Sequence, residues 1–384
     1  MRILHTADWH LGRLFYKTHL TDDQAHVLDQ ITALAKDARP DLFIVAGDIF
    51  DRTNPPVEAV ELLDDVLTRL VRDLRCRVLM IAGNHDSPSR LEFGSRLLAQ
   101  PGLHVYGRLD GPVSPLVLDD AHGPVAFVPI PYAEPPVVRQ ALGRDDVRTP
   151  DEAMRALIGS LSGDVPRGAR LVMVAHAFVT GGAGSDSERP LSVGTLETVG
   201  LDAFAGWDYV ALGHLHGPQQ FDEGRVRYSG SPMKYSFSEA AHRKSVTLLE
   251  LGAGGERSIE EIALTPRRDL RRLKGTLDEI RARAASDPAR DDYLEVELMD
   301  EGALLDPMGQ LRLVYPNVMS ISRPYLERLS DPDAPQLDRK RTGDVELFED
   351  FFAQVIGRDV EKAERAAFAD AVEAMERARR EAGR

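Results

Sequence analysis

The chain has 384 residues, a length that suits two domains or one large domain with an appendage. Hydrophobic residues make up 43% of the chain, which is enough for a buried core. Its formal net charge of −15 argues against a generic basic nucleic-acid binder, although bound metals and a local basic surface can override global charge. The single cysteine, Cys76, excludes an intrachain disulfide. Because we find no signal peptide and no run long enough to span a membrane, we expect a cytoplasmic protein.

The first two-thirds of the chain alternates apolar runs with amphipathic segments. Helices are expected over 22–38 and 59–74, where apolar residues recur at helical spacing. Buried strands are expected within 1–8, 40–50, 76–86, 123–132, 169–178, 208–217 and 244–251. Strands interleaved with helices in this way predict an α/β core.

The character of the chain changes near residue 265. Segments from 267 to 325 suggest a small β-α-β-α-β unit, and 331–343 reads as a linker rich in proline and charge. We place domain boundaries at 1–265, 266–330, 331–343 and 344–384. The last segment is strongly helical, and it either packs on its own chain or faces a partner, the option we favour. Its apolar stripe comprises Phe348, Phe351, Phe352, Val355 and Ile356.

Five of the apolar strands end in side chains that ligate metals. These are Asp8, His10, Asp48, Asp51, Asn84, His85, His176, His214 and His216. Any one of them fits ordinary turn chemistry. Five such endings are hard to explain by turns alone, because buried polar groups are costly unless they find partners. Since functional crevices lie at the carboxyl ends of strands in α/β sheets, we expect these residues to converge.

The donor set narrows the choice of metal. Oxygen and nitrogen ligands without a thiolate suit manganese best, with iron, magnesium or zinc also compatible. The candidates are too many for one ion. Two divalent ions about 3.5–4 Å apart that share a carboxylate would use them all.

The order DxH, GDxxD, GNHD, a lone histidine and GHxH resembles the calcineurin-like metallophosphoesterase superfamily. The resemblance implies a two-sheet α/β/β/α sandwich with a small α+β capping domain and a helical tail. It also implies one ion held by Asp8, His10, Asp48 and His216. The second would be held by Asp48, Asn84, His176 and His214, so that Asp48 bridges the two ions.

The same resemblance implies phosphoester hydrolysis with His85 as the general acid, a role that suits histidine because it titrates near neutral pH. Asp51 would orient and charge the His85 imidazole. The alternative is that Asp51 only caps the following turn.

A finer resemblance is to the SbcD family of Mre-type nucleases. It is carried by ILHTADWHLGR, DLFIVAGDIFDR, AGNHDSPSRL, GHLHGPQ, YSGSPMKYSFSE and PRRDLRRLKG. The family implies DNA exonuclease and endonuclease activity in repair and recombination, within a complex with an SbcC-type coiled-coil ATPase bound through the C-terminal helices. The predicted DNA contacts are Arg13, Tyr16, Lys17, Arg267, Arg268 and Arg271.

The family also implies a homodimer within a heterotetramer, formed by helices over 60–75 and 89–100. The apolar face of Leu62, Leu63, Val66, Leu67 and Leu70 suits either this pairing or the chain's own core. Two other functions remain open. One is a phosphomonoesterase or protein phosphatase of the same superfamily, in which Arg52 would bind a terminal phosphate. The other is a scaffold without catalysis, although every expected ligand is present.

Overall fold

The computed structural model describes residues 1–161, 165–188, 198–301, 304–325, 345, 348–349, 351–353 and 358–382. The chain forms two compact units, Met1–Asp269 and Leu270–Arg384. The linker expected over 331–343 lies outside the described residues, as do Val355 and Ile356 of the tail. Among the described helices, none is long and apolar enough to cross a bilayer.

The first unit is built on two six-stranded sheets, ordered β14-β13-β1-β4-β5-β6 and β11-β12-β10-β9-β8-β7. The first contains β1 (Arg2–Thr6), β4 (Leu42–Val45), β5 (Val78–Ile81), β6 (Leu103–Tyr106), β13 (Ser245–Leu251) and β14 (Arg257–Ala263). The second contains β7 (Leu116–Asp120), β8 (Gly123–Ile130), β9 (Arg170–His176), β10 (Tyr209–Gly213), β11 (Gln219–Phe221) and β12 (Val226–Tyr228). In each sheet the central strands are parallel, so their carboxyl ends share one edge.

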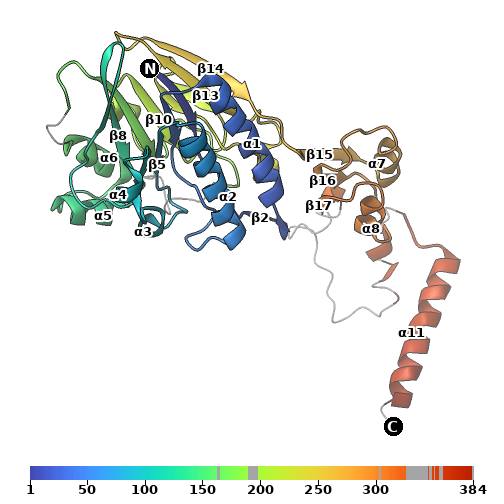
Figure 1. Ribbon diagram of the computed structural model, residues 1–384. Coiled ribbons are helices and arrows are strands. Elements are labelled where there is room, and N and C mark those ends of the chain that lie inside the picture. The colour runs from blue at the N-terminus through green and yellow to red at the C-terminus, as the bar shows by residue number, and fades with distance from the viewer. Residues whose placement is uncertain are drawn as a thin grey trace. The chain divides into compact units, whose positions relative to one another are not determined.

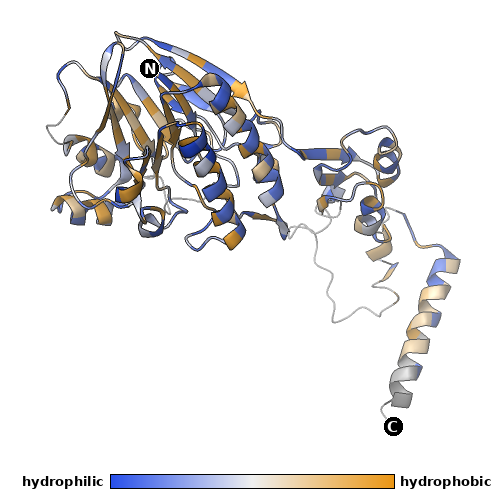
Figure 2. Cartoon of the chain, in the orientation of Figure 1, coloured by the Kyte–Doolittle hydropathy of each residue, from blue (hydrophilic) through white to orange (hydrophobic). Residues whose placement is uncertain are grey.

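Helices cover the outer face of each sheet (Figure 1). α1 (Thr21–Ala38) and α2 (Val57–Leu67), which continues as a π-helix over Thr68–Asp73, pack on the first sheet. α5 (Pro135–Leu142) and α6 (Pro150–Gly159) pack on the second. Apolar side chains such as Ile44 and Phe127 fill the space between the sheets, where the strands are orange in Figure 2. The predicted α/β/β/α sandwich is confirmed.

Short elements complete the first unit. They are β2 (Leu14–Phe15), β3 (Thr18–His19), α3 (Pro88–Leu91), α4 (Ser95–Leu98) and two 3₁₀ turns at Leu201–Phe204 and Phe237–Glu239. The helix expected over 89–100 is thus two single turns, because Gly94 between them adopts a left-handed φ of 76°.

The predicted apolar face of α2 belongs to the chain's own core. Leu63, Val66 and Leu70 are buried against the first sheet, so these three side chains serve the core. Exposed apolar side chains of α2 are Val57 (67% exposed) and Val60 (47% exposed), and others lie in or just before α4, Phe93 (87% exposed) and Leu97 (83% exposed).

The second unit contains the predicted β-α-β-α-β unit. Its parallel strands are β15 (Leu270–Gly275), β16 (Tyr293–Leu298) and β17 (Val318–Ser322), joined through α7 (Leu277–Arg283) and α8 (Pro307–Arg312). The chain ends in α11 (Lys362–Ala382). Phe348 stacks on Phe368 of α11 with ring centres 4.0 Å apart, whereas Phe351 is 60% exposed. Part of the predicted stripe therefore packs on the tail itself.

Candidate metal centre

The strand ends bring all seven predicted ligands to one edge of the first unit. Asp8 and His10 follow β1, Asp48 follows β4, and Asn84 follows β5. His176 ends β9, and His214 and His216 follow β10. Ligand atoms of Asp8, His10 and His216 lie within 4.8 Å of one another, as do those of Asp8, Asp48 and His176. Two groups of ligands thus converge from both sheets.

Asp48 belongs to the second group and also faces His10 of the first. Its Oδ2 atom is 3.6 Å from His10 Nε2 and also 3.6 Å from His176 Nε2. Its Oδ1 atom accepts a hydrogen bond from the backbone N–H of His85 (2.9 Å). A carboxylate so placed faces both histidines, which is the position that a bridging ligand requires.

One contact in the cluster brings two acceptor atoms together. His176 Nδ1–H donates to the Ala46 carbonyl (2.9 Å), so its Nε2 atom carries a lone pair. The Nε2 atom lies 2.9 Å from the Asn84 Oδ1 atom, which is an acceptor as well. Two facing acceptors repel unless a cation is shared between them.

Burial makes a bound cation more stabilising for this cluster. It raises the pKa of the Asp8 carboxyl, an effect that the nearby Asp48 reinforces. Burial and the neighbouring His216 lower the pKa of His10, which keeps that imidazole neutral and able to ligate. Asp8 Oδ2 and His10 Nδ1 are buried without a hydrogen-bond partner among the described residues. With only oxygen and nitrogen donors, the cluster fits hard or borderline divalent ions.

The backbone at the ligands is strained. Asp8, His10, Asp48 and His214 all have positive φ, between 45° and 112°, a region that costs non-glycine residues about 1–3 kcal/mol each. Hydrogen bonds across the cluster hold this geometry. The His10 N–H donates to the Asp48 carbonyl (3.0 Å), and the His214 N–H donates to Asp8 Oδ1 (2.9 Å). Such strain persists where the surroundings enforce it, as at functional sites.

Two glycines explain why the ligands approach so closely. A Cβ atom on Gly47 would overlap the His176 ring, and one on Gly83 would overlap the Asp48 carboxylate. Gly47 also has a φ of 93°, which glycine adopts without strain. The glycine before each of Asp48 and Asn84 in the sequence is therefore a packing requirement of the cluster.

His85 stands beside the cluster, with its ring centre 4.7 Å from that of His10. Its Nδ1–H donates to the main-chain carbonyl of Asp51 (2.8 Å). Its Nε2 atom is buried and has no hydrogen-bond partner among the described residues. The structure thus leaves one ring nitrogen available for a substrate.

The contact between Asp51 and His85 differs from the expected one. The predicted contact uses the Asp51 carboxylate, but the hydrogen bond in the structure uses the carbonyl oxygen. The Asp51 carboxylate instead bonds Arg13 Nη1 (2.9 Å) and lies 3.6 Å from His10 Nδ1. The Asp51 N–H donates to the Leu11 carbonyl (3.1 Å). This bond helps to fix the backbone, so that the carbonyl and the carboxylate of Asp51 face different partners.

A buried relay behind His216 was missed in the sequence. His216 Nδ1–H donates to Ser187 Oγ (2.6 Å), and the Ser187 hydroxyl donates to Glu239. Lys244 pairs with the Glu239 carboxylate and also donates to the His216 carbonyl (2.8 Å). These contacts leave the lone pair of His216 on Nε2, 3.0 Å from His10 Nε2.

Glu239 is held as an anion in this relay. Burial alone would raise its pKa, but Lys244 and the contact with His216 outweigh burial and keep that pKa well below the usual carboxylate range. The signal in the sequence was the final glutamate of YSGSPMKYSFSE, which follows the last ligands. Nothing in the local pattern links it to Ser187, 52 residues earlier.

Replacing Ser187 with alanine should lower the manganese affinity of the site that includes His216 by about 10–100-fold. The reason is that the imidazole loses the partner that fixes its tautomer. Glu239→Gln should act in the same direction. Manganese titration followed by electron paramagnetic resonance measures this, with the exposed Ser258→Ala as a control. Unchanged affinity in both relay variants would contradict the role.

The predicted DNA-contact residues have different surroundings. Arg267 pairs with Asp22 (3.4 Å), and Arg268 pairs with Asp23 (3.3 Å). In the second unit, Arg271 pairs with Asp287 (3.0 Å). The run that looked most basic in the sequence is thus largely compensated by carboxylates. Tyr16 is 51% exposed and Lys17 is exposed, both in the turn between β2 and β3, whereas Arg13 pairs with Asp51.

Comparison with known proteins places the chain in a family. Residues 1–218 match the family described as calcineurin-like phosphoesterase, and residues 266–355 match the type 5 capsule protein repressor C-terminal domain. The SbcD subunit of the nuclease SbcCD from Staphylococcus epidermidis is 30% identical over 352 residues, which cover 92% of each chain.

Two solved structures were also matched. TT1561 of Thermus thermophilus is 14% identical, covering 68% of this chain and 98% of its own (TM-score 0.39). A dimetal phosphatase from Danio rerio is 15% identical, covering 68% and 96% (TM-score 0.39). The match over more than half of the chain and the near full-length relative show that this chain belongs to the calcineurin-like phosphoesterases, in the SbcD family.

Proposed function

We propose that the chain is the nuclease subunit of a complex with a coiled-coil ATPase, and that it cleaves DNA phosphodiesters with two divalent ions, manganese by preference. The observation that carries the proposal is the convergence of seven ligands from both sheets, with Asp48 facing each group. The name of the near full-length relative, a nuclease subunit, supports a nucleic acid as the substrate, and we propose DNA.

Each residue of the cluster has a role in this proposal. Asp8, His10, Asp48 and His216 would hold one ion, and Asp48, Asn84, His176 and His214 the other. When bound, the ions polarise the phosphate and activate water at neutral pH. His85, oriented by the Asp51 carbonyl, donates a proton from its unpartnered Nε2 atom to the leaving oxygen.

Of the two candidate DNA contacts, the turn between β2 and β3 is the more accessible to a DNA strand. The Tyr16 ring packs on Phe15 and Phe237, which stiffens it as a stacking surface, and Lys17 beside it offers a cation. Arg267, Arg268 and Arg271 would first have to exchange their carboxylate partners for phosphates.

Exposed apolar side chains support the proposed assembly. Phe351, in the segment before α11, supports docking of the tail on an SbcC-type ATPase. Phe93 and Leu97, which are exposed near α2, support pairing of two copies in a homodimer within a heterotetramer. The proposal includes roles in DNA repair and recombination, as the family resemblance implies.

The decisive experiment compares two substrates. The purified chain with manganese should degrade end-labelled duplex DNA and open hairpin ends, with poor turnover of p-nitrophenyl phosphate. Magnesium, iron and zinc replace manganese in parallel reactions. Efficient monoester turnover without DNA cleavage would favour the phosphatase alternative. In that alternative Arg52 would bind the terminal phosphate, but here its guanidinium contacts the Gly12 carbonyl (3.4 Å).

A further inference from the structure

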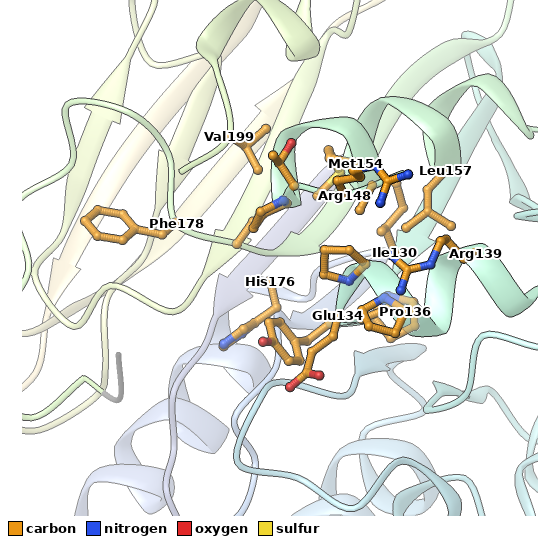
Figure 3. Close-up of a pocket in the computed structure, with 18 residues that line it drawn as sticks. Ile130, Glu134, Pro136, Arg139, Arg148, Met154, Leu157, His176, Phe178 and Val199 are labelled. Carbon is orange, nitrogen blue, oxygen red and sulfur yellow. The ribbon is translucent and has the colours of Figure 1, made fainter. Parts of the chain in front are cut away.

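A cavity of about 590 Å³ opens at the carboxyl ends of β8 and β9, beside the metal cluster. Its floor is apolar and includes the buried side chains of Met154 and Leu157 from α6. Figure 3 shows His176 and Phe178 on one side, with Arg139 and Arg148 on the other. A volume in this range is typical of sites for small organic groups.

The cavity is continuous with one half of the cluster. His176 belongs to its lining. The Phe178 ring lies 5.8 Å from that of His214, and the Tyr132 ring lies 6.3 Å from that of His176. His85 is not part of the lining, and it contacts His10 in the other half. The cavity and the proton donor therefore adjoin different ligands.

The lining combines surfaces that suit a nucleoside with a phosphate. Tyr132 offers an aromatic face for a base, and the exposed Glu134 offers an acceptor for a base amino group. The Arg139 guanidinium donates to the Val147 carbonyl (2.7 Å), which fixes it in place. Arg148 is exposed, and it forms no ion pair with any of the described residues. A free guanidinium at the rim can donate to acceptor atoms of a base or a sugar whose phosphate lies at the metal ligands.

We propose that this cavity binds the base and sugar of the nucleotide that keeps the phosphate after cleavage. This inference rests on the proposed function. In the hydrolysis, water oxygen bonds to phosphorus and the bond from phosphorus to the leaving oxygen breaks. That oxygen takes its proton from His85. The half of the substrate that retains phosphate then lies away from His85, toward His176 and the cavity.

The test uses the released product as a probe. The full chain with manganese should be inhibited by 2′-deoxyadenosine 5′-monophosphate or by its 3′ isomer, competitively with DNA ends. The inhibiting isomer shows which ester bond is cut. Inhibition by neither isomer at millimolar concentration would overturn the proposal.

Variants then locate the binding site. Arg148→Ala should weaken inhibition by about tenfold, the loss expected for one charge-assisted contact. Arg144→Ala is the matched control. It is four residues away and exposed, but its guanidinium is paired with Asp146, so inhibition should not change. Tyr132→Leu should also weaken inhibition, because the base loses a stacking surface. Equal inhibition of all four proteins would place the product elsewhere.

A substrate without a base separates this proposal from the proposed function. Bis(p-nitrophenyl) phosphate has no nucleoside, so its hydrolysis reports on the metal cluster alone. If the wild-type chain cleaves neither this diester nor DNA, the proposed function fails. If it cleaves both but the nucleotides do not inhibit, only the cavity assignment fails.

Discussion

Replacing His85 with leucine will slow DNA cleavage by about 10²–10⁴-fold, while both metal ions remain bound. The imidazole is the only predicted catalytic side chain whose buried nitrogen has no partner among the described residues. The contact of residue 85 with the cluster is made by its backbone N–H, which donates to Asp48 Oδ1 (2.9 Å). Leucine retains that contact, so the ligands stay in position.

The measurement compares leaving groups. Thymidine p-nitrophenyl phosphate releases p-nitrophenolate, which needs no proton, so the variant should approach wild-type rates on this ester. Elemental analysis of the dialysed protein counts the metals. A variant equally slow on both substrates, or one that has lost an ion, would contradict the role of His85 as the proton donor.

Asp51→Asn distinguishes the two contacts that Asp51 makes. Because the carbonyl of Asp51, rather than its carboxylate, accepts from His85 Nδ1–H, asparagine preserves the orientation of the imidazole. We expect the rate to fall by less than about tenfold, well short of the loss of a general acid. A defect as large as that of His85→Leu would restore the dyad that the sequence suggested.

The strands and the ligands at their ends were predictable because their signals are local. The run 42–45 is apolar at every position, and all four side chains are buried, as expected of a strand covered on both faces. The glycines before Asp48 and Asn84 are visible in the sequence, although their steric reason appears only in three dimensions. The prediction that two sheets pack face to face came from the family resemblance and from no local pattern.

The parts that could not be predicted depend on contacts between distant residues. Ser187 and Glu239 are 52 residues apart, and only the fold brings them behind His216. Arg271 was predicted to contact DNA, but in the structure it pairs with Asp287 on another segment of the same small unit. The face of α2 was ambiguous because an apolar stripe serves a core and a partner equally well.

Replacing Asp48 with asparagine should have the largest effect on metal binding. Asp48 Oδ2 lies 3.6 Å from His10 Nε2 and 3.6 Å from His176 Nε2, so one carboxylate would serve both proposed ions. An amide is neutral and offers a single oxygen. We expect the affinity for the second manganese to fall by more than about 100-fold, beyond the loss typical of outer-shell partners. Electron paramagnetic resonance would show loss of the coupled signal of two ions.

Two histidine variants provide the comparison, because the fold assigns neighbouring residues to different groups. His214 Nδ1 lies 3.3 Å from Asn84 Oδ1, whereas His216 Nε2 lies 3.0 Å from His10 Nε2. His214→Ala should therefore weaken mainly the ion of Asn84, and His216→Ala mainly the ion of His10. Asp48→Asn alone should weaken both. Two ions bound normally by Asp48→Asn, or equal loss of both ions in each histidine variant, would contradict a centre bridged by Asp48.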